Sequence, residues 1–302
     1  IRAMALNIYM EQSAVRDGVT AEEVKGILLG MASGQETLLG YFRRFIRNFE
    51  KRVGINRTVG SLRAYSNAYS HIERFLQAQY KLSDIPFSAL DRSFIDKYDL
   101  YLRTERNLAP GTIINLTVQL KTIVGEAIAD GVITASPFMG YEPVRPKHVQ
   151  KYLTAEELHR IMTTPLHRQT LYHVRDMFLF SCFTGIPYGD MRLLTKDNLC
   201  LAEDGIWWIK SARQKTKIEF EIPLLDLPLQ ILKKYSGTAP GDKLLPMYCN
   251  STLNLYLKEI ARICHIDRPL VFHAGRLTYA TEITHSHGVP LETVSRMLGH
   301  SQ

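Results

Sequence analysis

The sequence VFHAGRLTYATEITHSHGVPLETVSRMLGHSQ, residues 271–302, decides the fold. Within it His273 and Arg276 are three residues apart, and residues at that spacing project from the same face of an α-helix. An arginine presents a planar fork of donors that matches two phosphate oxygens, and a histidine adds a donor whose charge changes near neutral pH. A Gly-Val-Pro turn separates this helix from a second one that ends in Leu298-Gly299-His300. The pairing therefore indicates a helix that binds a phosphate group.

The composition is that of a two-domain protein with a polyanionic partner. The 302 residues exceed the usual size of one domain, and 45% of them are hydrophobic, which is enough for substantial cores. No apolar run approaches the roughly eighteen residues of a membrane span, and the N-terminus lacks the apolar region of a secretory signal. The net charge of +7 favours a polyanion, although charge alone does not separate nucleic acid from an anionic membrane. Four cysteines without metal-ligand spacing indicate reduced, mostly buried thiols: Cys182, Cys200, Cys249 and Cys264.

The motifs at the end of the chain resemble the second conserved box of the tyrosine recombinases, the phage and transposon integrases. The likeness rests on His-x-x-Arg, the Gly-Val-Pro turn, Leu-Gly-His, and the threonine-aromatic-alanine-threonine pattern at residues 278–281. It implies phosphoryl transfer from DNA to a protein tyrosine and back, without a metal ion or cofactor. By the same resemblance Arg276 clamps the scissile phosphate, while His273 and His300 flank it. His285 and His287 match no part of the pattern and are interpreted as surface residues.

Residues 36–137 are expected to form a helical domain, because apolar residues recur at spacings of three and four along four segments. The predicted helices are about 36–51, 58–79, 91–104 and 110 or 112 to 130. Four such helices, closed by a Ser-Pro pair, resemble the SAM-like core-binding domain of the integrases, whose second and fourth helices face DNA. Most contacts of such a domain go to phosphate. The candidate DNA contacts are Arg57, Arg63, Asn67, Thr112, Asn115 and Lys121.

The segments on either side of this domain are interpreted as a lead-in and a linker. Residues 1–35 have helical patterning with a capping box at Thr20 and Glu23, and their abrupt start indicates the remnant of a longer N-terminal region. Residues 138–152 have the proline and charge content of an extended basic linker. Arg145 and Lys147 in this linker are further candidates for DNA contact.

A second domain is expected over residues 153–302, because Thr154 and Glu157 form a capping box ahead of an apolar-periodic helix. Between residues 199 and 223 the apolar residues alternate, which predicts a hairpin or a small three-stranded sheet. Further helices are predicted at about 171–185, 226–235 and 250–264. The predicted fold class is mainly α: a helical SAM-like domain, then a mixed α/β, mainly helical domain with a small antiparallel sheet. The second part resembles the integrase catalytic domain.

The predicted hairpin supplies a further candidate from the resemblance. In Ala-Arg-Gln-Lys-Thr, Lys215 lies where the family keeps a lysine on a mobile hairpin, as the general acid toward the leaving 5′ oxygen. The downstream Glu-Ile-Pro-Leu is also typical of the family. Arg213 precedes Lys215 by two residues, so in an extended chain both side chains point to the same face.

The first conserved box departs from the family pattern. In Phe-Thr-Gly-Ile-Pro-Tyr-Gly-Asp, Pro187 occupies the place of an expected arginine, and a proline cannot clamp a phosphate. Arg192 lies about 140° around a helix from Pro187, away from the site, so Arg213 is the predicted replacement. Asp190 keeps the acidic position of the box and is expected to orient Arg276 or a histidine from behind.

The family's nucleophilic tyrosine follows the Leu-Gly-His box after a further short segment, whereas this sequence stops at Gln302. Tyr279 falls in a core-like pattern, and Tyr188 has no matching motif. The resemblance therefore predicts a catalytic domain truncated before its nucleophile. Such a chain is expected to bind DNA but not to cleave it covalently, unless a partner chain donates the tyrosine.

These patterns together predict a site-specific DNA recombinase, an integrase of a bacterial mobile element. Its two domains are expected to clamp duplex DNA, to assemble as a synaptic tetramer, to work with or without DNA-bending accessory proteins, and to act in the cytoplasm on the nucleoid. The alternative is a catalytically defective, recombinase-like accessory protein, which Pro187 and the missing tyrosine also suit. The sequence has no carboxylate cluster of the kind that a metal-dependent nuclease usually needs. A type IB topoisomerase shares the chemistry, but the separate helical front domain and the Gly-Val-Pro and Leu-Gly-His motifs resemble an integrase more closely.

Overall fold

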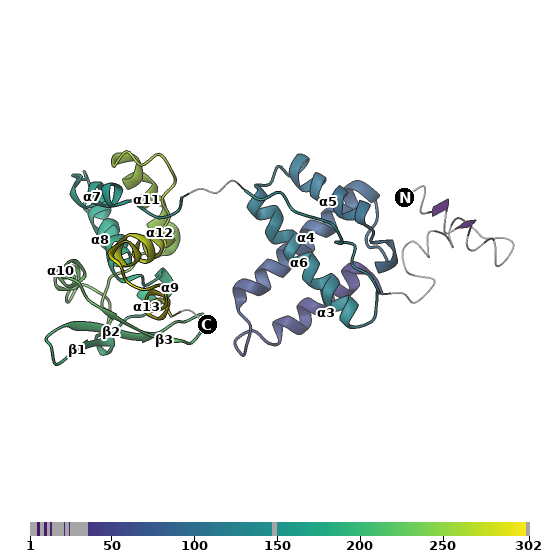
Figure 1. Ribbon diagram of the computed structural model, residues 1–302. Coiled ribbons are helices and arrows are strands. Elements are labelled where there is room, and N and C mark those ends of the chain that lie inside the picture. Colours follow the sequence, from purple (N-terminus) through teal and green to yellow (C-terminus); the bar gives the residue numbers. More distant parts are fainter. Residues whose placement is uncertain are drawn as a thin grey trace. The chain divides into compact units, whose positions relative to one another are not determined.

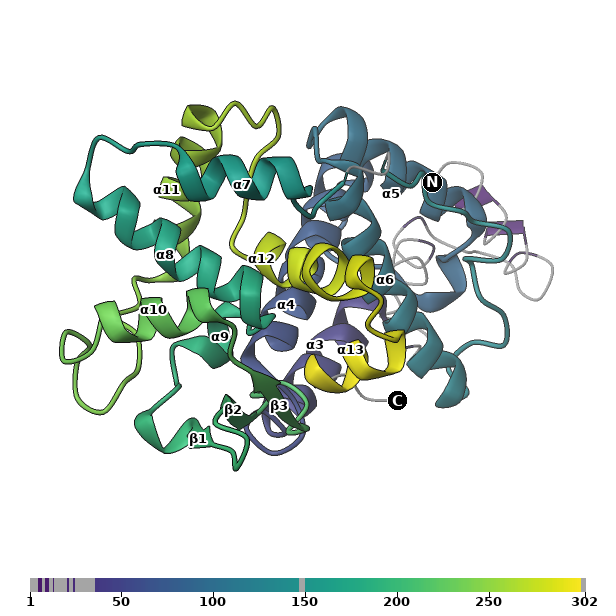
Figure 2. The ribbon, with the colours of Figure 1, turned by 60° about the vertical axis from the view of Figure 1, so that its left-hand side comes forward.

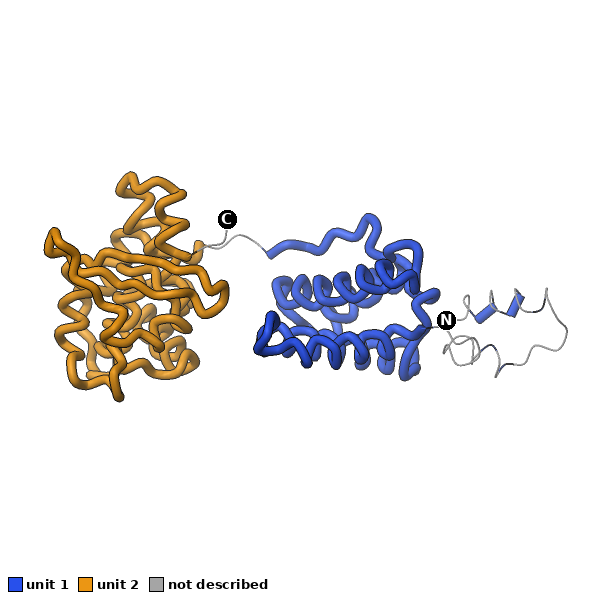
Figure 3. The backbone as a smooth tube through the Cα atoms, turned by 90° about the horizontal axis from the view of Figure 1, so that it is seen from below, with its two compact units in different colours: residues 1–148 blue, residues 149–302 orange. Residues whose placement is uncertain are grey.

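The computed structural model describes residues 36–146 and 150–299, together with seven single positions before residue 36 (Figure 1). The chain divides into two compact units, residues 1–148 and 149–302, which Figure 3 colours separately. The capping box predicted at Thr20 and Glu23 lies outside the described residues, as do the candidates Lys147 and His300.

Four long helices make up most of the first unit. They are α3 (Leu38–Glu50), α4 (Val59–Phe75), α5 (Arg92–Thr104) and α6 (Pro110–Ala129). A π-helical segment, Leu76–Tyr80, extends α4. Two of the helices start at capping side chains, because the Thr58 hydroxyl accepts from the Ser61 backbone N–H and the Asp91 carboxylate accepts from that of Phe94. The four predicted helices are therefore confirmed.

Aromatic rings fill the core of the first unit. The ring centroid of Phe75, at the end of α4, lies 5.1 to 5.5 Å from those of Tyr80, Phe94, Tyr98 and Tyr101. Aromatic pairs at such distances contribute about 0.5–1.5 kcal/mol each beyond the area that they bury. A second group of rings joins α3 to α4, so the bundle is held around α4.

The segment after α6 belongs to the first unit for longer than the sequence indicated. Phe138 is 4% exposed, the Tyr141 hydroxyl donates to Asp99 Oδ1 at 2.7 Å, and the Arg92 guanidinium lies 5.5 Å from the centre of the Tyr141 ring. The predicted linker of residues 138–152 therefore begins with residues that pack on α5.

The second unit is mainly helical around one small sheet. Its helices are α7 (Ala155–Thr163), α8 (Gln169–Thr184), α9 (Tyr188–Met191), α10 (Asp226–Lys234), α11 (Asn250–Ile263), α12 (His273–Thr278) and α13 (Leu291–Met297). Its strands are β1 (Leu199–Leu201), β2 (Trp207–Ala212) and β3 (Glu219–Pro223). The strands pair antiparallel in the order β1-β2-β3, with Ile209 opposite both Leu199 and Ile222. The predicted fold class, the three-stranded sheet and the capping box of Thr154 and Glu157 are confirmed.

Helix α8 is the central element of the second unit, where it contacts α7, α10, α11 and α12 (Figure 2). Most of its residues are buried, as expected for a mainly apolar helix in a core. Asp176 is a charged residue inside this core, and it accepts hydrogen bonds from Lys234 Nζ at 2.5 Å and from the Tyr235 hydroxyl at 2.9 Å. Its burial is therefore compensated by two donors.

All four cysteines are free, but only half of them fit the prediction of buried thiols. Cys182 and Cys264 are buried, whereas Cys200 and Cys249 are exposed. No described helix is both long enough and apolar enough to span a bilayer.

Gly185 ends α8 in the left-handed region, with φ +68°. A Cβ atom there would lie 2.5 Å from Tyr279 Cδ1 and 2.8 Å from Leu298 Cδ2. We expect Gly185→Ala to lower the free energy of unfolding by roughly 2–5 kcal/mol, from backbone strain plus overpacking. Gly205→Ala is the matched control, since Gly205 has φ +81° with nothing within 4 Å of its Cβ position, and it should cost only about 1–2 kcal/mol. Equal losses in urea denaturation would contradict the packing role of Gly185.

Candidate active site

Close packing of α12 against α8 sets the position of the His-x-x-Arg motif. A Cβ atom at Gly275 would lie 3.0 Å from Ser181 Cβ and 3.3 Å from the Cys182 backbone nitrogen, so a glycine allows the two helices to approach. His273 is the first residue of α12 and is exposed, whereas Arg276, one turn later, is only 6% exposed. The predicted pair therefore lies on one helix, with its arginine inside and its histidine at the surface.

Arg276 is held by two backbone carbonyl groups, one at the end of α8 and one at the end of α13. Its Nη1 donates to the Gly185 oxygen at 2.9 Å and its Nη2 to the Leu298 oxygen at 2.6 Å. Burial and, to a smaller extent, the positive charge of Arg213 lower the pKa of Arg276 to about 10, and the charge of Asp190 opposes this shift. The guanidinium therefore stays charged at neutral pH, in a site built from the ends of α8 and α13.

Arg213 reaches the same carbonyl group from the turn between β2 and β3. Its Nη1 donates to the Leu298 oxygen at 3.2 Å, and its Nε forms an ion pair with Asp190 Oδ2 at 2.8 Å. The side chain of Arg213 is 14% exposed. The structure thus brings Arg213 and Arg276 together at one oxygen atom.

Gly299 leaves room for Arg213 at this place. Gly299 has φ +60°, and a Cβ atom there would lie 2.7 Å from Arg213 Cγ. The Thr216 hydroxyl donates to the Gly299 oxygen at 3.4 Å. Leu298 and Gly299 therefore form part of the surface on which the hairpin packs.

Asp190 contacts the hairpin, which differs from its expected role. Besides the ion pair with Arg213, its Oδ1 accepts a hydrogen bond from the backbone N–H of Gln214 at 2.9 Å. The sequence favoured Arg276 or a histidine as its partner, yet its effect on Arg276 is through charge. Its carboxylate instead fixes both the side chain of Arg213 and the start of the turn.

Pro187 and Arg192 lie at the two ends of the short helix α9. Pro187 precedes the helix with φ −77° and ψ 162°, as its N-cap, and Arg192 follows it as the C-cap. Arg192 is exposed. The described side chains around Arg276 include Arg213, which donates to the same Leu298 oxygen. That Arg213 replaces the arginine missing at position 187 stays a prediction.

Lys215 lies at the tip of the β2–β3 turn. The turn is closed by hydrogen bonds from the Lys217 N–H to the Arg213 oxygen at 2.8 Å and from the Arg213 N–H to the Ile218 oxygen at 2.9 Å. Lys215 is exposed, as are Gln214 and Thr216. Its ammonium group is therefore accessible to a partner in solution, beside a turn that Asp190 holds in place.

A further cation near the site was not predicted from the sequence. The pKa of His273 is lowered, first by desolvation and then by the positive charges of Arg276, Arg213 and Lys151. Lys151 lies just before the capping box of α7, in the segment taken for a linker. Its basic character was visible in the sequence, but its proximity to His273 depends on the fold.

The lowered pKa of His273 gives a direct test of this geometry. Arg213→Ala removes a neighbouring positive charge, so we expect the pKa of His273 to rise toward its ordinary value. The ring resonances of His273, followed by NMR as a function of pH, report the pKa. Arg192→Ala serves as the control and should leave the titration unchanged. An unchanged titration in Arg213→Ala would contradict the proximity of the two groups.

The candidate DNA contacts that the structure describes in the first unit are all exposed, and they lie on more than one helix face. Arg63 and Asn67 are four residues apart and lie on one face of α4. Thr112 and Asn115 likewise share a face of α6, whereas Lys121 lies about half a turn away from Thr112. Lys121 therefore does not belong with the other two. Arg145 is exposed after the packed segment.

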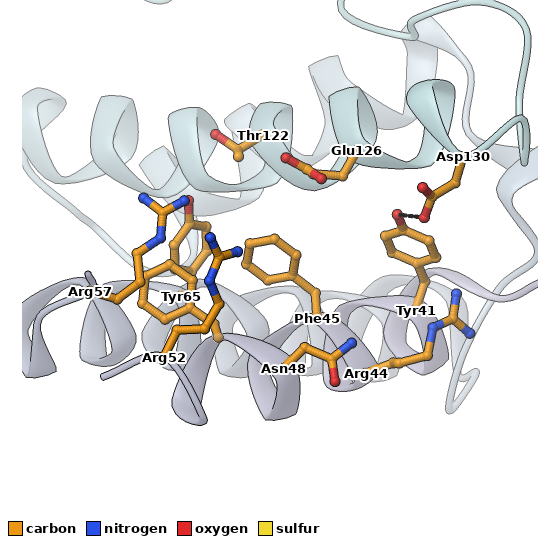
Figure 4. Close-up of a pocket in the computed structure, with 11 residues that line it drawn as sticks. Tyr41, Arg44, Phe45, Asn48, Arg52, Arg57, Tyr65, Thr122, Glu126 and Asp130 are labelled. Atoms are coloured by element: carbon orange, nitrogen blue, oxygen red, sulfur yellow. Dashed lines mark hydrogen bonds between the residues drawn. The ribbon is translucent and has the colours of Figure 1, made fainter. Parts of the chain in front are cut away.

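Arg57, the remaining candidate, lies at a cavity between α3, α4 and α6 (Figure 4). Its guanidinium is 5.3 Å from the centre of the Phe49 ring. The cavity has a volume of about 390 Å³. Arg52 and Arg57 lie on one wall, and Glu126 lies on the other.

Two family models match the chain. The model of the phage integrase SAM-like domain matches residues 37–143, and that of the phage integrase family matches residues 151–302. The chain belongs to the phage integrase family. The resemblance to the tyrosine recombinases is thereby confirmed, and the protein is an integrase of the site-specific tyrosine recombinase type.

Solved integrase structures share the fold at low sequence identity. A lambda integrase dimer bound to a COC′ core site is 18% identical, with a TM-score of 0.68, over 88% of this chain and 96% of that chain. The Tn1549 transposon integrase with transposon right end DNA is 17% identical, with a TM-score of 0.68, over 88% and 92%. A lambda integrase tetramer bound to a Holliday junction is 16% identical, with a TM-score of 0.69, over 98% and 85%. No curated protein matches the integrase by sequence.

Proposed function

We propose that this integrase serves a mobile genetic element and cuts and rejoins duplex DNA through a 3′-phosphotyrosine intermediate. The observation that carries the proposal is the meeting of two guanidinium groups, Arg276 and Arg213, at the carbonyl oxygen of Leu298. Two like charges held together in a largely buried site favour an anion between them. A phosphodiester under attack gains negative charge on its nonbridging oxygens, and preorganised cations lower the barrier to that change.

In the proposed complex a phosphate oxygen takes the place of the Leu298 carbonyl oxygen. Both atoms are acceptors for the same N–H groups, and the charged phosphate forms the stronger hydrogen bonds. Arg276 is the bidentate clamp and Arg213 the second cation, in place of the arginine missing at Pro187. Asp190 holds Arg213 without touching the substrate.

Side chains around this phosphate carry out the proton transfers. A tyrosine oxygen attacks phosphorus and the bond to the 5′ oxygen breaks, so the leaving oxygen takes a proton, for which we assign Lys215. His273 is the candidate for the tyrosine proton, since its lowered pKa keeps the ring neutral at neutral pH. We assign His300 to the same phosphate by its motif. Reversal of these steps rejoins the strands without ATP, because the phosphotyrosine keeps the bond energy.

The nucleophile is a tyrosine other than Tyr279 or Tyr188. Tyr279 is 3% exposed, and its hydroxyl contacts Met297 Sδ at 3.3 Å. The Tyr188 ring packs edge-on against Phe272 at a centroid distance of 6.1 Å. The Tyr279 hydroxyl is therefore buried away from solvent, and Tyr188 matches no motif of the family's nucleophile.

We further propose that the chain acts as a clamp on DNA. Residues 36–137 serve as the core-binding domain, 138–152 as the linker with Arg145 and Lys147, and 153–302 as the catalytic domain. Structures of lambda integrase as a dimer on a core site and as a tetramer on a Holliday junction support assembly of several protomers on DNA. A bacterial cytoplasm is the proposed compartment, with the nucleoid as the site of action and DNA-bending proteins as further partners.

Covalent trapping tests the reaction. The full-length gene product is mixed with a nicked suicide duplex that releases a short 5′ fragment after cleavage, and the products are run on a denaturing gel. A protease-sensitive protein–DNA adduct supports the proposal. Salt-dependent DNA binding without any adduct would favour the accessory protein over the recombinase.

DNA affinity is expected to fall steeply with added salt. If about six phosphates are contacted, the equilibrium constant drops roughly 10³-fold between 50 and 200 mM salt, because each contact releases counterions. Fluorescence anisotropy of a labelled duplex measures this slope. An affinity that does not change with salt would contradict the proposed interface.

A further inference from the structure

The loop between α3 and α4 presents one apolar side chain to solvent. Ile55 is 82% exposed, which is the highest value among the large hydrophobic residues that the structure describes. Single exposed apolar residues are common on protein surfaces. Ile55 differs from these because it lies in a hydrogen-bonded loop among exposed cationic residues.

Backbone hydrogen bonds fix the loop that carries Ile55. The N–H groups of Ile55, Asn56 and Arg57 all donate to the Arg52 oxygen, at 3.2, 3.2 and 3.1 Å, and the N–H of Gly54 donates to the Arg57 oxygen at 3.0 Å. Gly54 has φ +87°, which a glycine adopts without strain. The apolar side chain is therefore carried by a closed turn, whose backbone loses little conformational freedom when it meets a partner.

The charge around Ile55 is of one sign along the sequence. Residues 51–72 contain Lys51, Arg52, Arg57 and Arg63 and no aspartate or glutamate. All four cations are exposed. Glu126 and Asp130 line the far wall of the neighbouring cavity, and Glu126 is opposite Arg52 and Arg57 (Figure 4). This surface suits a polyanion and, because of Ile55, one that offers apolar groups between its charges.

Helix α4 continues this surface from its first residue. Val59 is 50% exposed, and helical spacing places it on the same face as Arg63, Ser66 and Asn67, which are exposed as well. Helices that read the major groove of DNA contact base edges mainly with their N-terminal residues. Val59 is the first residue of α4, and Ile55 lies in the loop four residues before it.

We propose that Ile55 and Val59 determine DNA sequence preference by contacting the 5-methyl groups of thymines in the major groove. The assignment rests on the proposed function, because it requires the first unit to bind duplex DNA. The thymine methyl is the apolar group that a base pair displays in that groove, and apolar side chains recognise it. Arg57 and Arg63 then position the helix on the phosphates, and the two apolar side chains supply sequence information that phosphate contacts lack.

Replacement of thymine by uracil tests the assignment, since it removes the methyl group and keeps the base pair. A duplex is selected from a randomised pool with the 302-residue chain and copied with either dTTP or dUTP. Affinities are measured by fluorescence anisotropy at one fixed salt concentration. We expect the unmodified chain to bind the uracil duplex about four-fold more weakly for each methyl contacted. The double variant Ile55→Ala, Val59→Ala should bind both duplexes equally.

A matched control variant separates the thymine-methyl proposal from the recombinase proposal on which it rests. Leu100→Ala removes a side chain that is 58% exposed on α5, and this variant should keep the full uracil penalty. An equal penalty in the double variant, or no penalty in the unmodified chain, would overturn the assignment and leave the recombinase proposal intact. An unmodified chain that binds no duplex would overturn both.

Discussion

Arg276→Ala is expected to reduce the single-turnover rate of DNA cleavage by the full-length integrase by about 10³-fold or more. The guanidinium lies almost wholly buried between the Gly185 and Leu298 oxygens, so it needs little reorganisation to meet the charge that develops on the phosphate. Removing one preorganised donor from such a site costs roughly 10² to 10³ in rate, and an arginine at a transferring phosphoryl group is worth up to about 10⁵. Rapid-quench kinetics on a suicide duplex gives the rate.

Arg276→Lys separates charge from geometry in the same assay. A lysine keeps the positive charge but lacks the planar fork, so we expect this variant to remain at least about 10²-fold slower than the unmodified enzyme. DNA affinity should change little in both variants, because only one of many phosphate contacts is lost. Cleavage within tenfold of the unmodified rate in Arg276→Ala would contradict its role as the clamp.

Arg213→Ala is expected to slow cleavage by about 10²-fold or more, as the loss of the second cation. The side chain donates to the same Leu298 oxygen as Arg276 and is held by Asp190 at 2.8 Å. Arg192→Ala is the control, because Arg192 is the other arginine near Pro187 and is exposed. It should cleave at nearly the unmodified rate. The same single-turnover assay compares the two.

A variant of Asp190 tests whether the contribution of Arg213 to the cleavage rate depends on how Asp190 positions the Arg213 side chain. Asp190→Asn keeps the shape of the side chain but removes the charge that pairs with Arg213 Nε. We expect an intermediate loss of rate, with little further loss when it is combined with Arg213→Ala. A full and additive loss would mean that Asp190 acts apart from Arg213.

Most of the fold could be predicted from the sequence because its signals are local. Spacings of three and four gave the helices α3 to α6, and the capping box of Thr154 and Glu157 gave the start of α7. The alternation of apolar residues gave the sheet. Less local features were missed: α12 continues as a π-helical segment, Tyr279–Thr284, and residues after α6 pack on α5, since both depend on tertiary contacts.

The proposed members of the candidate site follow from the sequence, whereas their contacts do not. The motifs identified Arg276 and His273, and an extended-chain argument identified Arg213. That both arginines donate to the Leu298 oxygen, and that Asp190 holds Arg213 in place of Arg276 or a histidine, could not be predicted, because these contacts join segments about 20 to 90 residues apart. The position of Lys121, by contrast, follows from helix periodicity alone, because nine residues separate it from Thr112 and place it on another face of α6.

The claim that Arg213 is the second cation at the scissile phosphate is tested most directly by removing the charge that it is meant to neutralise. Single-turnover cleavage by the unmodified integrase and by Arg213→Ala is compared on a normal suicide duplex and on one with a methylphosphonate at the scissile position. The methylphosphonate lacks one nonbridging negative charge, so less cationic stabilisation is needed. The ratio of the two rates should be about 10² or more on the phosphodiester and fall toward one on the methylphosphonate. The same large ratio on both substrates, or full activity of Arg213→Ala on the phosphodiester, would contradict the role of Arg213.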